Sequence, residues 1–413
     1  MSTFTKMGGT TILTNEPYED DLSSLDDKTN TSDSSHSSKE RSFPKDNRFL
    51  RCSSNLVPRA NMPNSGAFTT LSAPKCPELD PASKVLKEFL LKSSSEFVRV
   101  NNLREKGWFE NKEKGDAFFA AQREKADHAD KKDEKHFYDM MVQIGEEMHR
   151  VTGALAPQGV RGFKVLDICM APGGYAAAVL KLSPGAEIYG ITLDEKAGGH
   201  PLLLDDPRLK CVKRMDITML FNLVLCDGIK LRTQRRDDWR EENEATRLAV
   251  SQLILALQRI NQGGTVIMLL HKVDMWPSVN ILYTFSKFAR VSVFKPSRKH
   301  QTRSSFYMIA QDVQPENEAA KAAVDEWKKV WWKTTCGGKE SKGEKIEEPT
   351  EKFVNDVIEQ FGEKLIELGH NAWRIQADAL SKTDYAGDAS ASASASASIA
   401  GSLNLTHRRE GLP

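Results

Sequence analysis

The chain has 413 residues, of which 28% are charged and 39% hydrophobic, and its formal net charge is +1. This length allows one substantial domain with extensions, and the near-neutral charge excludes a protein-wide field that would attract nucleic acid. The sequence contains no apolar run long enough to span a membrane and no apolar signal core near its start. We therefore expect an intracellular protein of the cytoplasm or nucleus, neither secreted nor membrane-bound.

The six cysteines are spread along the chain. None belongs to a CxxC pair or has a His partner at metal-ligand spacing, which argues against a zinc site and against a disulfide framework. Cys169 and Cys226 lie in apolar runs and are expected to be small buried side chains. This usage predicts a reducing compartment and no bound metal.

The N-terminal part of the chain changes character near residue 80. Residues 1–80 are rich in Ser, Thr, Asn, Asp and Pro, and we expect them to be disordered because they bury too little apolar surface. Residues 81–155 are expected to be a helical extension that packs on the core as a lid or scaffold. Apolar residues at helical spacing indicate two of its helices, namely Val85, Leu86, Phe89 and Leu90, then Phe137, Met141, Ile144 and Met148.

Residues 156–313 alternate short apolar runs with helical segments. The expected strands are FKVLDIC, AEIYGITLD, LKCVKRMD, FNLVLCDG, GGTVIMLL, RVSVFKP and SSFYMIAQDV, and the expected helices are YAAAVLKL, TRLAVSQLILALQRI and SVNILYTFSKF. This alternation predicts right-handed crossovers and an α/β fold, with a Rossmann-like, doubly wound, mainly parallel sheet covered on both faces. Ligands of such sheets bind beyond the carboxyl ends of the strands.

The C-terminal part is helical and then repetitive. We expect a helical extension over residues 314–380 and a disordered Ala/Ser-rich tail over 381–413. Three tryptophans of the extension, Trp327, Trp331 and Trp332, are expected to dock their helix on the core. Stacking of these rings on nucleic-acid bases is the alternative.

The segment from Asp167 to Tyr175 reads DICMAPGGY, an acidic strand end followed by a turn into a helix. Asp167 can pair with a ligand ammonium group, and Pro172 stiffens the turn. Gly173 and Gly174 allow close approach of a ligand, and the helix N-terminus favours a carboxylate. These features suit S-adenosylmethionine, whereas the GxGxxG fingerprint of dinucleotide sites is absent. An ordinary strand–helix turn is the alternative.

The string D-x-C-x-A-P-G-G resembles the cofactor loop of FtsJ/RrmJ-like RNA ribose 2′-O-methyltransferases. The segments ITLD, RMDI, LVLCDG, GGTVIML and KPSRKHQTRSSFYMIA follow in that family's order, so the likeness spans residues 137–313. It implies a methyltransferase fold that binds S-adenosylmethionine and methylates RNA. The cofactor residues that it implies are Asp167, Ala171, Pro172, Gly173, Gly174, Tyr175, Asp194 near the ribose and Asp216 near the adenine. For both Asp194 and Asp216, an aspartate that caps a helix or turn is the alternative.

The resemblance breaks down at the catalytic residues. The family uses a Lys-Asp-Lys-Glu tetrad, in which a central lysine of lowered pKa handles the proton of the ribose hydroxyl. Asp227 matches the aspartate, but Leu269 stands at the central lysine and Ser305 at the glutamate. The position of the first lysine is near Lys135, where the alignment is loose.

Two lysines outside the tetrad positions could replace the missing ammonium group, Lys272 and Lys230. Because strand side chains alternate between faces, Lys272 is a catalytic candidate only if the chain turns directly after the strand. A solvated surface lysine is the alternative. Three functions stay open: an RNA ribose 2′-O-methyltransferase, a degenerate cofactor- or RNA-binding module, and a methyltransferase for a different acceptor.

A local basic cluster follows the sixth expected strand. We expect it to bind RNA phosphates through Lys295, Arg298, Lys299 and Arg303, supported by Lys230, Arg232, Arg235 and Arg236. Charge runs are commonly only a solvated surface, which is the alternative.

Overall fold

The computed structural model describes residues 79–127, 131–156, 162–197, 199–211, 219–230, 237–241, 243–338, 340 and 342–386. They all belong to one unit of the chain, Ala73–Pro413. Nearly all of the two predicted disordered ends lies outside the described residues. The same holds for four predicted site residues, namely Asp216, Arg232, Arg235 and Arg236.

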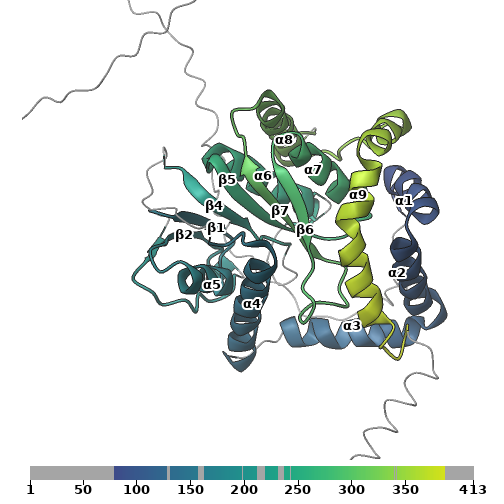
Figure 1. The fold of residues 1–413 in the computed structure, drawn as a ribbon, viewed down its shortest axis with the longest axis horizontal. Helices are drawn as coiled ribbons and strands as arrows, with labels where there is room; N and C mark the ends of the chain where they lie inside the picture. The colour runs from purple at the N-terminus through teal and green to yellow at the C-terminus, as the bar shows by residue number, and fades with distance from the viewer. Residues whose placement is uncertain are drawn as a thin grey trace, which may run out of the picture. The chain divides into compact units, whose positions relative to one another are not determined.

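The described residues form a seven-stranded sheet with the strand order β3-β2-β1-β4-β5-β7-β6 (Figure 1). Its strands are β1 (Lys164–Ile168), β2 (Glu187–Ile191), β3 (Leu209–Cys211), β4 (Phe221–Cys226), β5 (Ile260–Leu270), β6 (Arg290–Phe294) and β7 (Phe306–Val313). β1 to β5 pair in parallel, whereas β7 runs antiparallel to both β5 and β6. The predicted α/β fold with a mainly parallel sheet is confirmed.

One face of the sheet is covered by α4 (Lys131–Thr152) and α5 (Gly174–Leu182), which pack against each other (Figure 1). Met141, Ile144 and Met148 of α4 are buried, as the helical spacing predicted. They join strand residues such as Val165 and Ile188 in one hydrophobic cluster. This packing fixes the helix that follows β1, and with it the loop between them.

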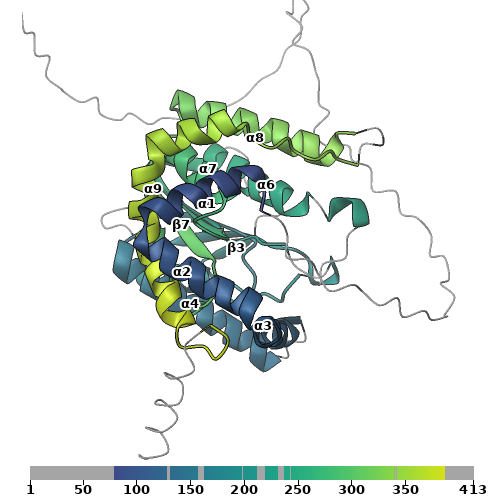
Figure 2. The ribbon, with the colours of Figure 1, turned by 90° about the vertical axis from the view of Figure 1, so that its right-hand side faces the viewer.

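The opposite face is covered by helices from the centre and from both extensions (Figure 2). They are α1 (Pro81–Ser93), α2 (Ser95–Glu105), α6 (Glu244–Arg259), α7 (Trp276–Ser286), α8 (Glu318–Cys336) and α9 (Glu351–Leu380). Leu86 of α1 and Trp373 of α9 are fully buried in the same cluster as Phe285 of α7. The extensions are therefore part of the core that supports the sheet.

The N-terminal extension changes direction in a short π-helical turn. α2 runs directly into η1 (Lys106–Glu110), and α3 (Lys112–Asp127) follows.

The start of α1 is fixed by its capping residues, because Asp80 accepts a hydrogen bond from the amide of Ser83 (2.7 Å) and Pro81 occupies the first turn. Among the helices of the described ranges, none is long and apolar enough to cross a membrane.

Candidate functional site

The loop between β1 and α5 depends on two glycines for different reasons. Gly173 has a φ of 99°, a left-handed conformation that favours glycine. Gly174 packs tightly on α4, since a Cβ there would lie 2.5 Å from both the Met141 Cβ and the Tyr138 carbonyl oxygen. A Cβ on Gly173 would lie 2.8 Å from the Leu204 Cβ. Close contacts within the protein thus account for glycine at both positions, in addition to the predicted approach of a ligand.

Two carboxyl groups, one buried and one partly accessible, lie near the carboxyl ends of the neighbouring strands β1 and β4. Asp167 is 1% exposed, and neither of its carboxylate oxygens has a hydrogen-bond partner among the described residues. Asp227 directly follows β4, and its buried Oδ1 also lacks a partner there. Burial, followed by the charge of Asp227, holds the pKa of Asp167 well above its usual range. Burial alone raises the pKa of Asp227 to about 7.

Two tyrosines close the site on the side of α4. Tyr175 and Tyr307 are buried, and their hydroxyl groups share a hydrogen bond. Burial raises the pKa of each phenol, and the charge of Asp227 raises both further. Tyr307 lies opposite Leu269 in the pairing of β7 with β5, and Leu269 packs against the hydrophobic cluster under α4. The position of the family's central lysine is therefore apolar here.

The remaining predicted cofactor residues lie around one large cleft at this edge of the sheet. Ala171, Pro172, Tyr175 and Asp227 line it, together with the segment that follows β2. Asp194 is exposed in that region, and its Oδ1 accepts a hydrogen bond from the Lys196 amide (2.8 Å). Asp194 thus has the turn role that was the alternative for it, while its second oxygen is not used in this bond.

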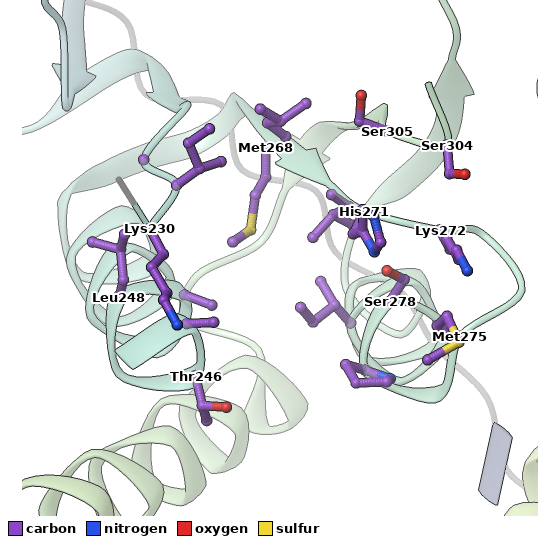
Figure 3. Close-up of a pocket in the computed structure, with 18 of the residues that line it drawn as sticks. Lys230, Thr246, Leu248, Met268, His271, Lys272, Met275, Ser278, Ser304 and Ser305 are labelled. Carbon is purple, nitrogen blue, oxygen red and sulfur yellow. The ribbon is translucent and has the colours of Figure 1, made fainter. Parts of the chain in front are cut away.

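The two candidate lysines lie on opposite walls of the pocket drawn in Figure 3. β5 ends at Leu270 and the next residues turn, with the Met275 amide bonded to the Lys272 carbonyl (3.3 Å). This turn begins at Lys272, and the chain already bends at His271, so the strand does not continue to Lys272, as a catalytic role for it requires. Lys230 forms an ion pair with Glu241, so its charge is already partly balanced.

Hydrogen bonds between residues that are far apart in the sequence stabilise the rim of the cleft. Nη1 of Arg104, on α2, binds both carboxylate oxygens of Asp274 at 3.0 Å, and Nη2 binds Gln376 of α9 at 2.6 Å. Gln376 in turn donates to the Thr302 carbonyl (3.1 Å). The two extensions thus tie the loop after β5 to the loop before β7. Sequence reasoning missed this network, because no local pattern links these positions.

In the basic loop after β6, one of the residues predicted to bind phosphates, Lys295, is buried. Lys295 is only 5% exposed, and its ammonium group donates to the carbonyl oxygens of His300, Arg303 and Ser305 at 2.8, 2.6 and 2.7 Å. Burial, together with the smaller effects of the Arg104 and Arg303 charges, lowers its pKa to about 7. The expectation that Lys295 binds RNA phosphates is therefore corrected: it organises the loop from inside.

The other members of the basic cluster lie nearer the solvent. Arg298 and Arg303 are exposed, and Lys299 is half-buried. Since Lys295 anchors the loop that carries them, these three side chains are the ones placed to meet a phosphate. Within the described ranges, no three His, Cys, Asp or Glu side chains are grouped to hold a metal ion.

Comparison with known proteins gives one family match and several distant structural neighbours. No curated protein matches the chain. Among solved structures, a Plasmodium falciparum protein provisionally named a ribosomal RNA methyltransferase is 16% identical, with 41% of this chain and 93% of that chain covered and a TM-score of 0.29. An O-methyltransferase family protein from Burkholderia thailandensis is 14% identical, with 46% and 63% covered and a TM-score of 0.27. The family model of FtsJ-like methyltransferases matches residues 146–313, so the likeness to this family lies in the central region of the chain.

Proposed function

We propose that the protein is an S-adenosylmethionine-dependent methyltransferase whose acceptor is a ribose 2′-hydroxyl of RNA. The observation that carries the cofactor assignment is the pair of neighbouring carboxyl groups of Asp167 and Asp227, because both buried oxygens of Asp167 and the buried Oδ1 of Asp227 lack hydrogen-bond partners in the described structure. Buried carboxylates without partners are costly, and a cationic ligand offsets that cost. S-adenosylmethionine carries both an ammonium and a sulfonium group, so the residues present fit it.

The residues of the β1–α5 loop would hold the methionine part of the cofactor. In this proposal Asp167 binds the ammonium group, and the N-terminus of α5 at Gly173 and Gly174 favours the carboxylate. Ala171, Pro172 and Tyr175 form the adjoining wall, with Asp194 near the ribose and Asp216 near the adenine. When bound, S-adenosylmethionine supplies an electrophilic methyl group.

The residues beyond β4 and β5 would act on the acceptor. Asp227, with its pKa near 7, can hold a proton or accept one close to neutral pH. Lys272 is the proposed ammonium group that stabilises the developing alkoxide, because the chain leaves the direction of β5 at the bend just before it. Arg298, Lys299 and Arg303 would bind phosphates and orient the strand, since methyl transfer depends mainly on alignment.

A second function is favoured by the tetrad positions. Leu269 cannot handle a proton, and it packs into an apolar cluster opposite Tyr307. Ser305 likewise brings no carboxylate to the place of the family's glutamate. These two residues favour a module that keeps the cofactor site without methylating ribose, or a methyltransferase with a different acceptor.

A transfer assay distinguishes these functions. The full chain is incubated with total RNA and S-adenosylmethionine that is labelled in the methyl group. The RNA is then digested to nucleosides and separated by chromatography. We expect label in 2′-O-methyl nucleosides, and its loss in Asp227→Ala. Label in methylated bases would instead identify another acceptor group, and tight cofactor binding without any transfer would support the module.

A further inference from the structure

Two large aromatic side chains stand exposed at the junction of α2 and α3. Trp108 and Phe109, both in η1, are 45% and 67% exposed. They lie outside residues 146–313, so the family likeness gives them no role. Exposed aromatic rings of this size are commonly part of a binding surface.

The junction holds the indole of Trp108 in a fixed position. Its ring stacks on that of Phe119, with centroids 5.9 Å apart and planes 6° from parallel. Phe119 packs in turn on Tyr385, which follows α9. The backbone is equally close, since a Cβ on Gly107 would lie 2.7 Å from the ring of Tyr385. The Asn111 side chain also donates to the Tyr385 carbonyl at 2.9 Å. A stacked and supported ring that is still 45% exposed forms a rigid platform.

The platform belongs to the same cleft as the candidate site. Trp108, Phe109 and Phe119 line that cleft together with Ala171, Asp227 and Arg303. A strand of nucleic acid whose ribose reached Asp227 would therefore extend along a cleft that is bordered by these rings.

The surroundings favour nucleobases over an apolar protein face. Charged residues flank the rings closely in the sequence, and Glu110, Lys112, Glu113 and Lys114 are all exposed. Two rings among charges offer little continuous apolar area, but each offers a flat face on which a base can stack. Any base can stack on such a ring, and the positive charge of Arg303, which lines the same cleft, can attract the phosphates.

We infer that Trp108 and Phe109 form a stacking site for unpaired bases of the acceptor RNA, in the same cleft as the nucleotide presented to Asp227. The inference rests on the proposed function and adds a preference for single-stranded RNA. Removing the platform should weaken binding of a single strand without changing its salt dependence, because no charge is lost.

The test measures binding of a fluorescent 12-nucleotide single-stranded RNA to the full chain by anisotropy, at several salt concentrations. The variants are Phe109→Ala, Trp108→Ala and the double variant, with Trp108→Phe as the conservative change. Trp332→Ala is the matched control, since Trp332 is 53% exposed on α8 and does not line the cleft. We expect the double variant to bind about tenfold or more weakly, with an unchanged salt slope. Trp108→Phe should retain most of the affinity, and an RNA duplex should show little difference between proteins.

Equal affinities of the wild type, the double variant and Trp332→Ala would overturn the inference. So would a change in self-association, measured by sedimentation, without a change in RNA affinity. Thermal melts show whether Trp108→Ala remains folded, and Phe109→Ala alone carries the test if it does not. If the double variant transfers methyl groups to RNA as well as the wild type does, only the stacking site is rejected. A wild type that binds S-adenosylmethionine but no RNA would reject the proposed acceptor as well.

Discussion

Asp227 lies close enough to Asp167 that its charge raises the pKa of the Asp167 carboxyl group, although burial is the larger cause. Asp167 lies in β1, and Asp227 directly follows the neighbouring parallel strand β4. Among the described residues, neither oxygen of Asp167 nor Oδ1 of Asp227 has a hydrogen-bond partner. Parallel α/β sheets bind their ligands at this edge. A cationic ligand between or beside these carboxyl groups would offset the cost of burying them.

The stability of the protein without cofactor should fall as pH rises from about 4 to about 7 because of Asp227. Its carboxyl group has a pKa of about 7 in the folded chain and about 3.9 when unfolded. The folded state therefore binds the proton more strongly, and this preference is lost as the group ionises. Because Asp227 is partly accessible, we expect an effect on the order of 1–3 kcal/mol.

Urea unfolding of the wild type and of Asp227→Asn, measured at closely spaced pH values, checks this. The difference in unfolding free energy between the two proteins should change across that pH range. Parallel pH profiles would contradict the assignment.

Affinity for S-adenosylmethionine should change in the opposite direction and increase between pH 5.5 and 8.5. The carboxyl groups must ionise to attract its cationic groups, and both have raised pKa values in the folded chain. Binding should therefore release protons. Calorimetry in two buffers of different ionisation enthalpy measures this release, and an affinity that is flat over this range would refute the pairing.

Lys295→Met should loosen the loop that carries Arg298, Lys299 and Arg303. The change leaves three carbonyl oxygens without their shared ammonium donor, at a cost of roughly 1–3 kcal/mol. Hydrogen exchange of the amides of residues 297–305 should accelerate, and RNA affinity should fall. Lys287→Met, a lysine on the exposed end of α7, serves as the control. Unchanged exchange in Lys295→Met would show that the bonds do not order the loop.

Lys272→Ala should slow methyl transfer by about 10²–10⁴-fold while cofactor affinity stays the same, since a general acid–base group contributes about that much. Lys230→Ala tests the second candidate, whose charge Glu241 partly balances. Single-turnover transfer to RNA measures both variants. If a fast wild type stays equally fast in each, neither lysine replaces the tetrad lysine, and a ribose hydroxyl is the wrong acceptor.

Local sequence pattern predicted the elements of this fold well. The apolar runs before Cys169 and Asp227 are buried parallel strands, and the spacing of Met141, Ile144 and Met148 marked the buried face of α4. These patterns follow directly from strand and helix periodicity. The motif from Asp167 to Gly174 lies at the edge of the sheet where such folds bind ligands.

Long-range contacts were beyond the sequence. Arg104 meets Asp274 and Gln376 across 170 and 272 residues, and no periodicity encodes such a pairing. Lys295 read as one more surface charge in a basic run, yet the turn at His300 brings carbonyl groups over it and draws it inside. The composition of a loop does not reveal which of its charges faces inward.

Titration calorimetry of the full chain with S-adenosylmethionine, in the wild type and Asp167→Asn, tests the central claim most directly. The variant keeps the size of the side chain and removes its charge, so a bond to the cofactor ammonium group worth about 1.5–3 kcal/mol is weakened. Asp325→Asn, on the exposed surface of α8, is the control. We predict one cofactor per chain, with an affinity at least tenfold lower in Asp167→Asn and unchanged in Asp325→Asn. Equal affinities in a folded Asp167→Asn protein, or no binding to the wild type, would contradict the account.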